Sequence, residues 1–96
     1  MKTIDEYLDL AKEYNGLNSD YALAKLLELK DSEMTQLRQK RSKINEATAT
    51  KLALSIGIDP MEVITAANYW QGKERHKSFW LWFYEKHIIS KKLPQK

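Results

Sequence analysis

The chain has 96 residues, of which 43% are hydrophobic and 30% charged, so we expect one globular domain and no second core. It contains no cysteine, which excludes disulfide bridges and thiolate metal sites and fits a reducing cytoplasm. No stretch approaches the roughly 18 apolar residues of a membrane span, and the first residues lack the apolar core of a signal peptide, so we expect neither.

The net charge of +3 conceals an asymmetry along the chain. Residues 1–37 carry four Lys against eight Asp and Glu, a balance of −4, whereas residues 38–96 carry 12 Lys and Arg against five Asp and Glu, a balance of +7. The basic part suits a polyanion such as nucleic acid or an anionic membrane. A merely solvated, charged surface explains the same composition equally well.

Three glycines and two prolines leave long stretches without breaks, which favours helices. Thr3 and Glu6 form a capping box that starts the first helix, and Asn15-Gly16 ends it. Its apolar residues recur at helical spacing and predict one buried face: Ile4, Tyr7, Leu8 and Ala11.

A second helix is expected from Asn18 or Ser19, both good N-terminal caps. Its expected buried side is formed by Leu23, Ala24, Leu26 and Leu27. A third, short helix follows over residues 31–39, with Met34 and Leu37 as its only large apolar residues. A helix held by so few apolar side chains is typical of one that presents a polar face to a partner.

Residues 38–43 then form a basic loop, and a fourth helix is expected over residues 45–56, closed by Gly57. Its expected buried residues are Ala49, Leu52, Ala53 and Ile56. Pro60 opens the fifth helix at a position where proline is tolerated, and residues 69–72 end it.

The last segment, residues 73–92, contains six consecutive large apolar residues at positions 79–84. Its flanks favour a helix, although a strand suits the same residues by propensity. As a helix it keeps one apolar face uncovered by the domain, so we expect it to form a homodimer. The expected dimer contacts are Phe79, Trp80, Trp82 and Phe83. Completion of the core and contact with a membrane surface remain alternatives.

Residues 20–39 fit the 20-residue helix-turn-helix pattern. Ala24 supplies the small residue that two crossing helices need, and apolar residues flank the turn. Three segments, residues 20–27 (DYALAKLL), 34–38 (MTQLR) and 51–60 (KLALSIGIDP), resemble the phage lambda repressor and Cro-type family, and the likeness covers residues 3–68. An ordinary helix pair in a small bundle is the simpler interpretation of the leucine spacing.

The resemblance implies an all-α fold: a compact five-helix repressor-like domain over residues 1–70, followed by an aromatic helix and basic tail over 71–96. It also implies sequence-specific binding of double-stranded DNA as a dimer, by a transcriptional regulator of phage or mobile-element type. By position, the residues expected to read bases are Asp31, Ser32, Thr35 and Gln36. Those expected to contact phosphates are Lys30, Arg38, Lys40, Arg41 and Lys43.

Two positions depart from the family pattern. Glu28 stands where the turn usually has glycine, and Asp20 stands where members often bind a phosphate. Asp31 and Glu33 are also acidic; they either complement the dipole at the start of the third helix or accept from cytosine.

The sequence predicts no catalytic residues, cofactor or metal, because His76 and His87 lie 11 residues apart with no further ligand cluster. The competing function is a protein-interaction module that keeps the repressor-like fold and binds a protein partner through its aromatic C-terminal segment.

Overall fold

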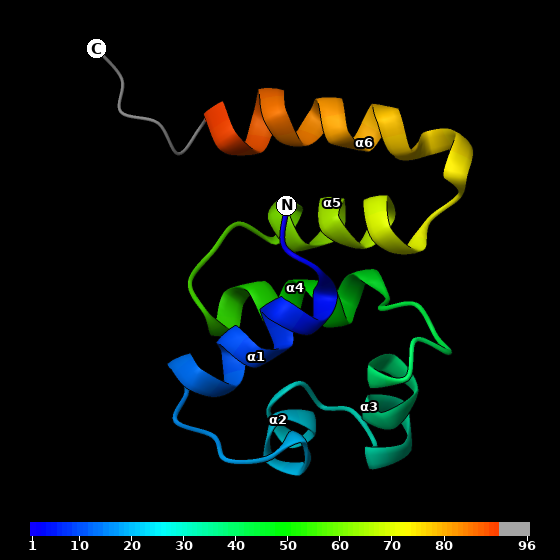
Figure 1. Cartoon of the computed structure of the whole chain (residues 1–96). Coiled ribbons are helices and arrows are strands. Elements are labelled where there is room, and N and C mark those ends of the chain that lie inside the picture. The colour runs from blue at the N-terminus through cyan, green and yellow to red at the C-terminus, as the bar shows by residue number, and fades with distance from the viewer. Residues whose placement is uncertain (91–96) are drawn as a thin grey trace.

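The computed structural model describes residues 1–90, and within them every regular element is a helix. The α-helices are α1 (Ile4–Tyr14), α2 (Asp20–Leu26), α3 (Asp31–Arg38), α4 (Glu46–Ser55), α5 (Pro60–Gln71) and α6 (Lys77–Phe83) (Figure 1). A short 3₁₀ turn, Glu74–His76, precedes α6, and a π-helix, Tyr84–Ile89, continues it. The expected all-α fold is therefore confirmed for the described part of the chain.

The local signals act as the sequence indicates. At α1 the Thr3 amide donates to the Glu6 carboxylate at 2.8 Å, while the Glu6 amide donates to the Thr3 hydroxyl at 3.2 Å. Ser19 caps α2 through the Ala22 amide, at 3.1 Å. One expectation on this stretch is wrong: Leu26 is 42% exposed, because it lies on the face of α2 turned away from the core.

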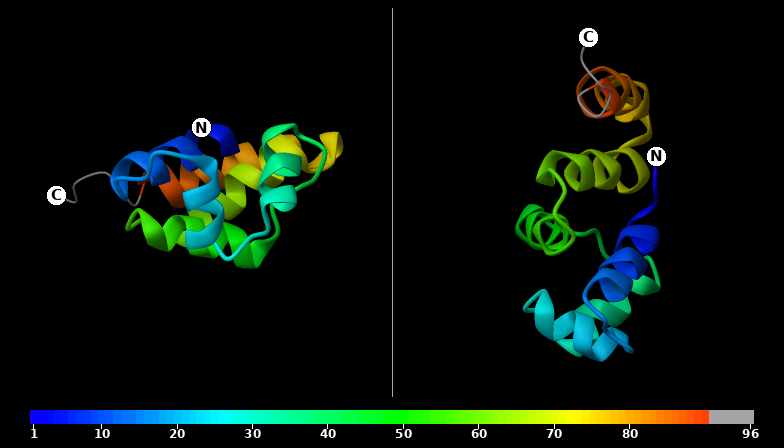
Figure 2. Two further views of the ribbon diagram at one scale, coloured as in Figure 1. Left: turned by 90° about the horizontal axis from the view of Figure 1, so that it is seen from below. Right: turned by 90° about the vertical axis from the view of Figure 1, so that its left-hand side faces the viewer.

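The helices stack in layers (Figure 1). α4 and α5 pack on each other at the centre, α1 crosses both, and α2 and α3 pack together at one end. α6 lies along the opposite side of α5, so it forms the end of the molecule furthest from α2 and α3 (Figure 2). The core between these layers is built from 16 buried apolar residues contributed by α1 to α5 and the loop before α4.

A buried polar pair joins α1 to α5. The Tyr7 hydroxyl donates to the Glu62 carboxylate at 2.7 Å, and both residues are at most 3% exposed. Burial, together with this hydrogen bond, raises the pKa of Tyr7 far above its ordinary value, so the phenol stays protonated as the donor. The pair satisfies polar groups that would otherwise be costly in the core.

Four helices end in the same way, with a residue of positive φ just beyond the last turn: Gly16, Glu28, Lys40 and Gly57. In each case the next amide donates back to a carbonyl five residues earlier, as in Leu29 to Ala24 at 2.8 Å and Arg41 to Gln36 at 2.9 Å. This arrangement satisfies helix carbonyls and favours glycine at the left-handed position. Two of the four positions hold a side chain, at a cost in backbone energy.

The aromatic segment is helical, which settles the open choice between helix and strand. Ile88 is buried and both α6 and the π-helix contact α5. The segment therefore completes part of the packing, as one of the sequence interpretations expects. Phe79 and Trp82 nevertheless remain 51% and 48% exposed.

The conformation of Glu28 generates a stability prediction. We expect Glu28→Gly to raise the free energy of unfolding by about 0.5–1 kcal/mol, because relief of the left-handed strain exceeds the loss of an exposed ion pair. That pair joins Glu28 to Lys51 at 2.9 Å. The matched control, Glu28→Ala, removes the pair but keeps the strain and should lower stability. Urea denaturation measures both, and equal effects of the two variants would contradict the account.

Candidate nucleic-acid interface

α3 presents a polar face to solvent. Its two buried residues, Met34 and Leu37, hold it against the core at 3% and 6% exposure. All four residues expected to read bases, Asp31, Ser32, Thr35 and Gln36, are exposed. The structure thus brings these four side chains to the surface of one short helix.

Two shallow hollows lie beside α3, so the helix forms a ridge between them. One, of about 300 Å³, is lined by Asp31, Thr35 and Arg38 of α3, by Gln39 just after it, and by Asp20 and Tyr21 of α2. The other, of about 220 Å³, is lined by Gln36 and Glu33 of α3 and, beyond it, by Ser42, Lys43, Asn45 and Thr48. The first side carries two carboxylates at its edge, whereas the second adjoins the basic loop.

The acidic residues at the start of α3 have different surroundings. Glu33 accepts a hydrogen bond from the Lys30 amide at 2.8 Å, which satisfies an amide at the helix start. This contact favours the structural interpretation of Glu33. Asp31 is exposed in the first turn, where its charge complements the helix dipole. The Lys30 side chain is exposed beside them.

The basic loop is held at both ends. Lys40 takes a positive φ of 60° at the end of α3, and the Ile44 amide donates to the side-chain oxygen of Gln71 at 2.9 Å. Lys40, Arg41 and Lys43 are exposed between these points. The Lys40 ammonium lies 3.2 Å from Asp5, but its side chain is 78% exposed, so this pair is weak. Three cations therefore stand on a loop with a defined backbone.

Arg38 is placed differently from the other expected phosphate contacts. Its guanidinium lies 2.7 Å from Asp9, 3.0 Å from Asp20 and 3.2 Å from Asp5, and the side chain is 21% exposed. Because the three carboxylates occupy its donors, Arg38 ties α3 to α1 and α2 and is not presented to solvent as a free cation. Asp20, where the family often binds phosphate, is likewise committed to Arg38 and Lys12.

These contacts shift the titration of Asp20. The hydrogen bond from Arg38 holds the pKa of Asp20 below its ordinary value; burial opposes this shift and Lys12 adds to it. The carboxylate therefore stays ionised over the whole physiological range, which keeps the ion-pair network intact.

The sequence did not predict two residues that lie beside this surface, Gln71 and Tyr21. Gln71, at the end of α5, holds the basic loop although it lies 27 residues from Ile44. Tyr21 is 55% exposed on α2 with the Lys25 ammonium 4.5 Å from its ring centre. The i, i+4 spacing of that pair was the one sequence signal available, whereas nothing local marks Gln71.

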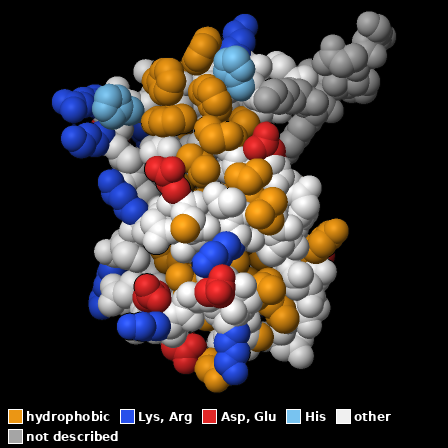
Figure 3. Space-filling view, turned by 180° about the vertical axis from the view of Figure 1, so that it is seen from behind, with side chains coloured by type: hydrophobic (Ala, Val, Ile, Leu, Met, Phe, Trp, Pro, Cys, Tyr) orange, Lys and Arg blue, Asp and Glu red, His pale blue; other side chains and the backbone are white. Residues whose placement is uncertain are grey.

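The residues expected at a dimer contact lie on α6. Phe79 and Trp82 are exposed, as above, whereas Trp80 and Phe83 are half-buried. Hydrophobic side chains gather over this end of the molecule, beside two histidines (Figure 3). The exposed apolar members include Leu81 and Ile89, both 39% exposed.

Comparisons with protein-family models, with curated proteins and with solved structures found no match. Among residues 1–90, no group of three or more His, Cys, Asp or Glu side chains could hold a metal ion. No helix in the same range is long and apolar enough to cross a membrane.

The Arg38 network predicts a pH-dependent loss of stability. Arg38→Met should lower the free energy of unfolding near pH 7 by roughly 1–3 kcal/mol, because hydrogen bonds to charged groups are lost and three carboxylates repel. A depressed pKa contributes stability above the unfolded value, about 3.9 for Asp, and loses it as pH falls through the folded value. The difference between variant and wild type should therefore shrink toward pH 3.

The matched control is Arg41→Met, which removes an exposed arginine three residues further on. Its effect should be small at both pH values. A pH-independent effect of Arg38→Met, measured by urea denaturation, would contradict a role for ionised carboxylates.

Proposed function

We propose that this chain is a sequence-specific regulator of transcription that binds double-stranded DNA, with α2 and α3 as a helix-turn-helix of the lambda repressor and Cro type. The observation that carries the proposal is the polar ridge of α3, whose buried apolar residues are Met34 and Leu37 and which is followed by a fixed basic loop. A helix of this kind fits a major groove about 12 Å wide.

The turn between α2 and α3 supports this assignment. Ala24 is fully buried and allows α2 to approach its neighbours closely. Glu28 adopts φ 59°, the conformation for which the family has glycine at this position. Glu28 therefore departs from the family pattern only in residue type, because its backbone still takes the left-handed conformation.

The hollows beside α3 suggest how DNA lies. The side with Lys43, Ser42 and Asn45 suits a phosphate backbone, because one cation and two small polar side chains line it beside Glu33. The side with Asp20 and Asp31 holds Arg38, whose guanidinium is committed to carboxylates, so this hollow offers no comparable cation to a phosphate. We therefore assign Lys30, Lys40, Arg41 and Lys43 to phosphates, and give Arg38 the role of positioning α3.

Gln36 is the residue we assign most directly to a base, because an amide can bond adenine N6 and N7 together. Gln36→Ala should weaken binding to the preferred site by roughly 1–3 kcal/mol and relax preference at one base pair. Selection from a random duplex pool, for wild type and variant, measures both. The exposed Gln39→Ala is the control. Equal weakening on every sequence would contradict base reading.

The basic loop should supply affinity without specificity. Replacing Lys40, Arg41 and Lys43 together by Ala should weaken binding similarly on all duplexes and flatten the salt dependence by about one unit of slope per lost contact. Titrations at several salt concentrations measure the slope. Lys51→Ala, which removes an exposed lysine of α4, is the control. An unchanged slope in the triple variant would remove the loop from the interface.

We further propose that two copies associate through the aromatic face of α6, since recognition of paired half-sites requires a dimer. An isologous contact needs only one self-complementary patch. Phe79 and Trp82 are its centre, with Trp80 and Phe83 beneath them. Because α6 and α3 lie at opposite ends, the two α3 helices should be far apart (Figure 2). Half-sites two helical turns apart therefore fit better than half-sites one turn apart.

The dimer proposal predicts that Phe79→Ser combined with Trp82→Ser gives a monomer by sedimentation at tens of micromolar, whereas wild type is dimeric. Each side chain is about half exposed, so the folded monomer should tolerate the change. Leu54→Ser, at 65% exposure on α4, is the control and should remain dimeric. A monomeric wild type would exclude the aromatic face as a dimer element.

The same exposed aromatic face favours one alternative, a module that binds a protein partner through α6. Salt-dependent binding to duplex DNA separates the two functions. If the chain binds no duplex from a random pool at low salt, the protein-interaction function is the better account.

A further inference from the structure

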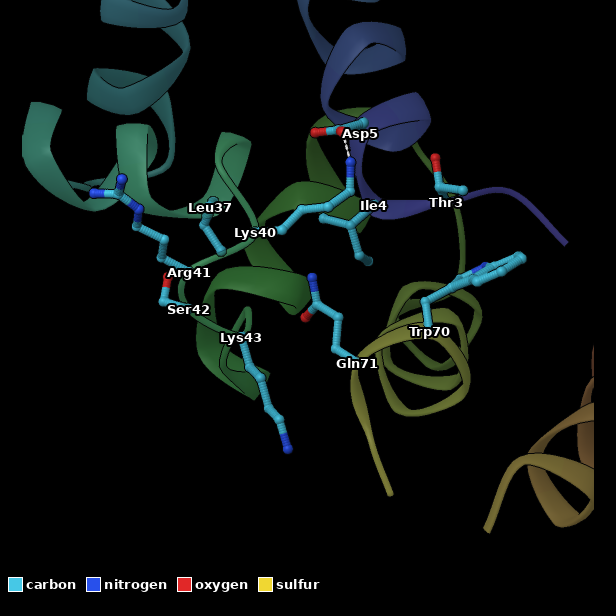
Figure 4. Close-up of a pocket in the computed structure, with 10 residues that line it drawn as sticks. All are labelled: Thr3, Ile4, Asp5, Leu37, Lys40, Arg41, Ser42, Lys43, Trp70 and Gln71. Carbon is cyan, nitrogen blue, oxygen red and sulfur yellow. Dashed lines mark hydrogen bonds and ion pairs between the residues drawn. The ribbon is translucent and has the colours of Figure 1, made fainter. Parts of the chain in front are cut away.

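A third hollow, of about 380 Å³, lies between three segments that are far apart in the sequence. The start of α1, the basic loop after α3 and the end of α5 form its walls (Figure 4). This volume lies within the range of sites that bind small molecules. We call it the α1–α5 hollow.

Its apolar lining is fixed in place. Ile4 and Leu37 are buried core residues that reach the hollow, and Trp70 stands at its side, 43% exposed. The Trp70 indole N–H donates to the carbonyl of Lys2 at 3.1 Å. This hydrogen bond holds the indole in one position. The Lys77 ammonium lies over one face of the ring, 5.3 Å from its centre, which leaves the opposite face for a ligand.

Its polar lining offers two donors, the Gln71 amide and the Lys40 ammonium. The Gln71 side-chain oxygen accepts from Ile44, so the amide nitrogen is the end left to donate, and it points toward Lys40 and Ile4 (Figure 4). Asp5 lies close to both Arg38 and Lys40, at 3.2 Å each, which compensates its charge. Arg41 and Lys43 point away from the hollow, whereas the Lys40 side chain lines it and ends in an ammonium group paired with Asp5 (Figure 4).

We propose that the α1–α5 hollow binds a flat aromatic carboxylate, with its ring against Trp70 and its carboxylate on Lys40 and Gln71. A carboxylate fits better than a doubly charged phosphate, because a single lysine, shared with Asp5, faces the site. Aromatic stacking and a charge-assisted hydrogen bond then act together.

The test is an NMR titration of the ¹⁵N-labelled full chain with indole-3-acetate, compared with the neutral isostere indole-3-acetamide. We expect saturable shifts at the Trp70 indole, the Gln71 side chain and the Ile44 amide, and binding of the amide at least about tenfold weaker. Equal binding of the two compounds, shifts confined to α6 or no saturation would overturn the proposal.

Variants locate the carboxylate. Lys40→Met should weaken indole-3-acetate binding by about two- to fivefold, since it removes the cation from an exposed side chain. Lys25→Met, on α2 outside the hollow, should bind as wild type does. Unchanged binding by Lys40→Met would overturn the assignment of the carboxylate to Lys40. The comparison of indole-3-acetate with indole-3-acetamide uses the wild-type protein, so it does not depend on this variant being folded.

A consequence for regulation rests on the proposed function. Because a bound carboxylate would occupy Lys40, saturating indole-3-acetate should weaken DNA binding in wild type and leave the Lys40→Met variant unaffected. An equal loss in both would overturn this coupling. The ligand titration is made without DNA, so failure of the DNA-binding proposal and failure of the binding site give different results.

Discussion

The position of α3 depends on one side chain, Arg38. The helix has only two buried apolar residues, so apolar packing alone fixes it weakly. Arg38 adds contacts with carboxylates on α1 and α2, all within 3.2 Å. A planar guanidinium with five donors can satisfy three partners at once, which a lysine cannot do in this geometry. These contacts offset the repulsion between the carboxylates of α1 and α2, and they hold the polar face of α3 toward solvent.

This constraint also explains the charge asymmetry. Three of the acidic residues in the first 37 positions face Arg38 and so belong to the scaffold. A fourth, Glu33, accepts from the Lys30 amide. The acidity of this half of the chain therefore does not argue against a polyanionic partner. Of the cations in the basic loop, Lys40 touches this network through Asp5 with an exposed side chain, whereas Arg41 and Lys43 are exposed beyond it.

Much of the fold follows from local sequence signals. Thr3, Ser19 and Pro60 begin helices where their chemistry predicts, and Met34 and Leu37 are the buried residues of α3 as expected. The residues expected to read bases follow from the family resemblance, and helical periodicity brings them to one surface. Their role in reading DNA stays a proposal.

Other features depend on contacts between distant segments. Arg38 was expected at a phosphate because it begins the basic segment 38–43. Its carboxylate partners, however, lie 18 to 33 residues away in the sequence. The left-handed backbone at Lys40 could not be predicted, because the residue there is not glycine. The hydrogen bond between Gln71 and Ile44 forms only once the fold brings these distant residues together. Leu26 was expected to be buried because it is apolar, but its position on α2 faces away from the core.

The most direct test of the central claim is to map the surface that duplex DNA covers. Adding a selected duplex to the ¹⁵N-labelled chain should shift the amide signals of residues 31–36 and 40–43. These shifts should disappear as the salt concentration is raised, because salt weakens binding to DNA. The amides around Phe79 and Trp82 should change little, since α6 lies at the other end of the molecule. Shifts concentrated on α6, or none at low salt, would contradict recognition of DNA by α3.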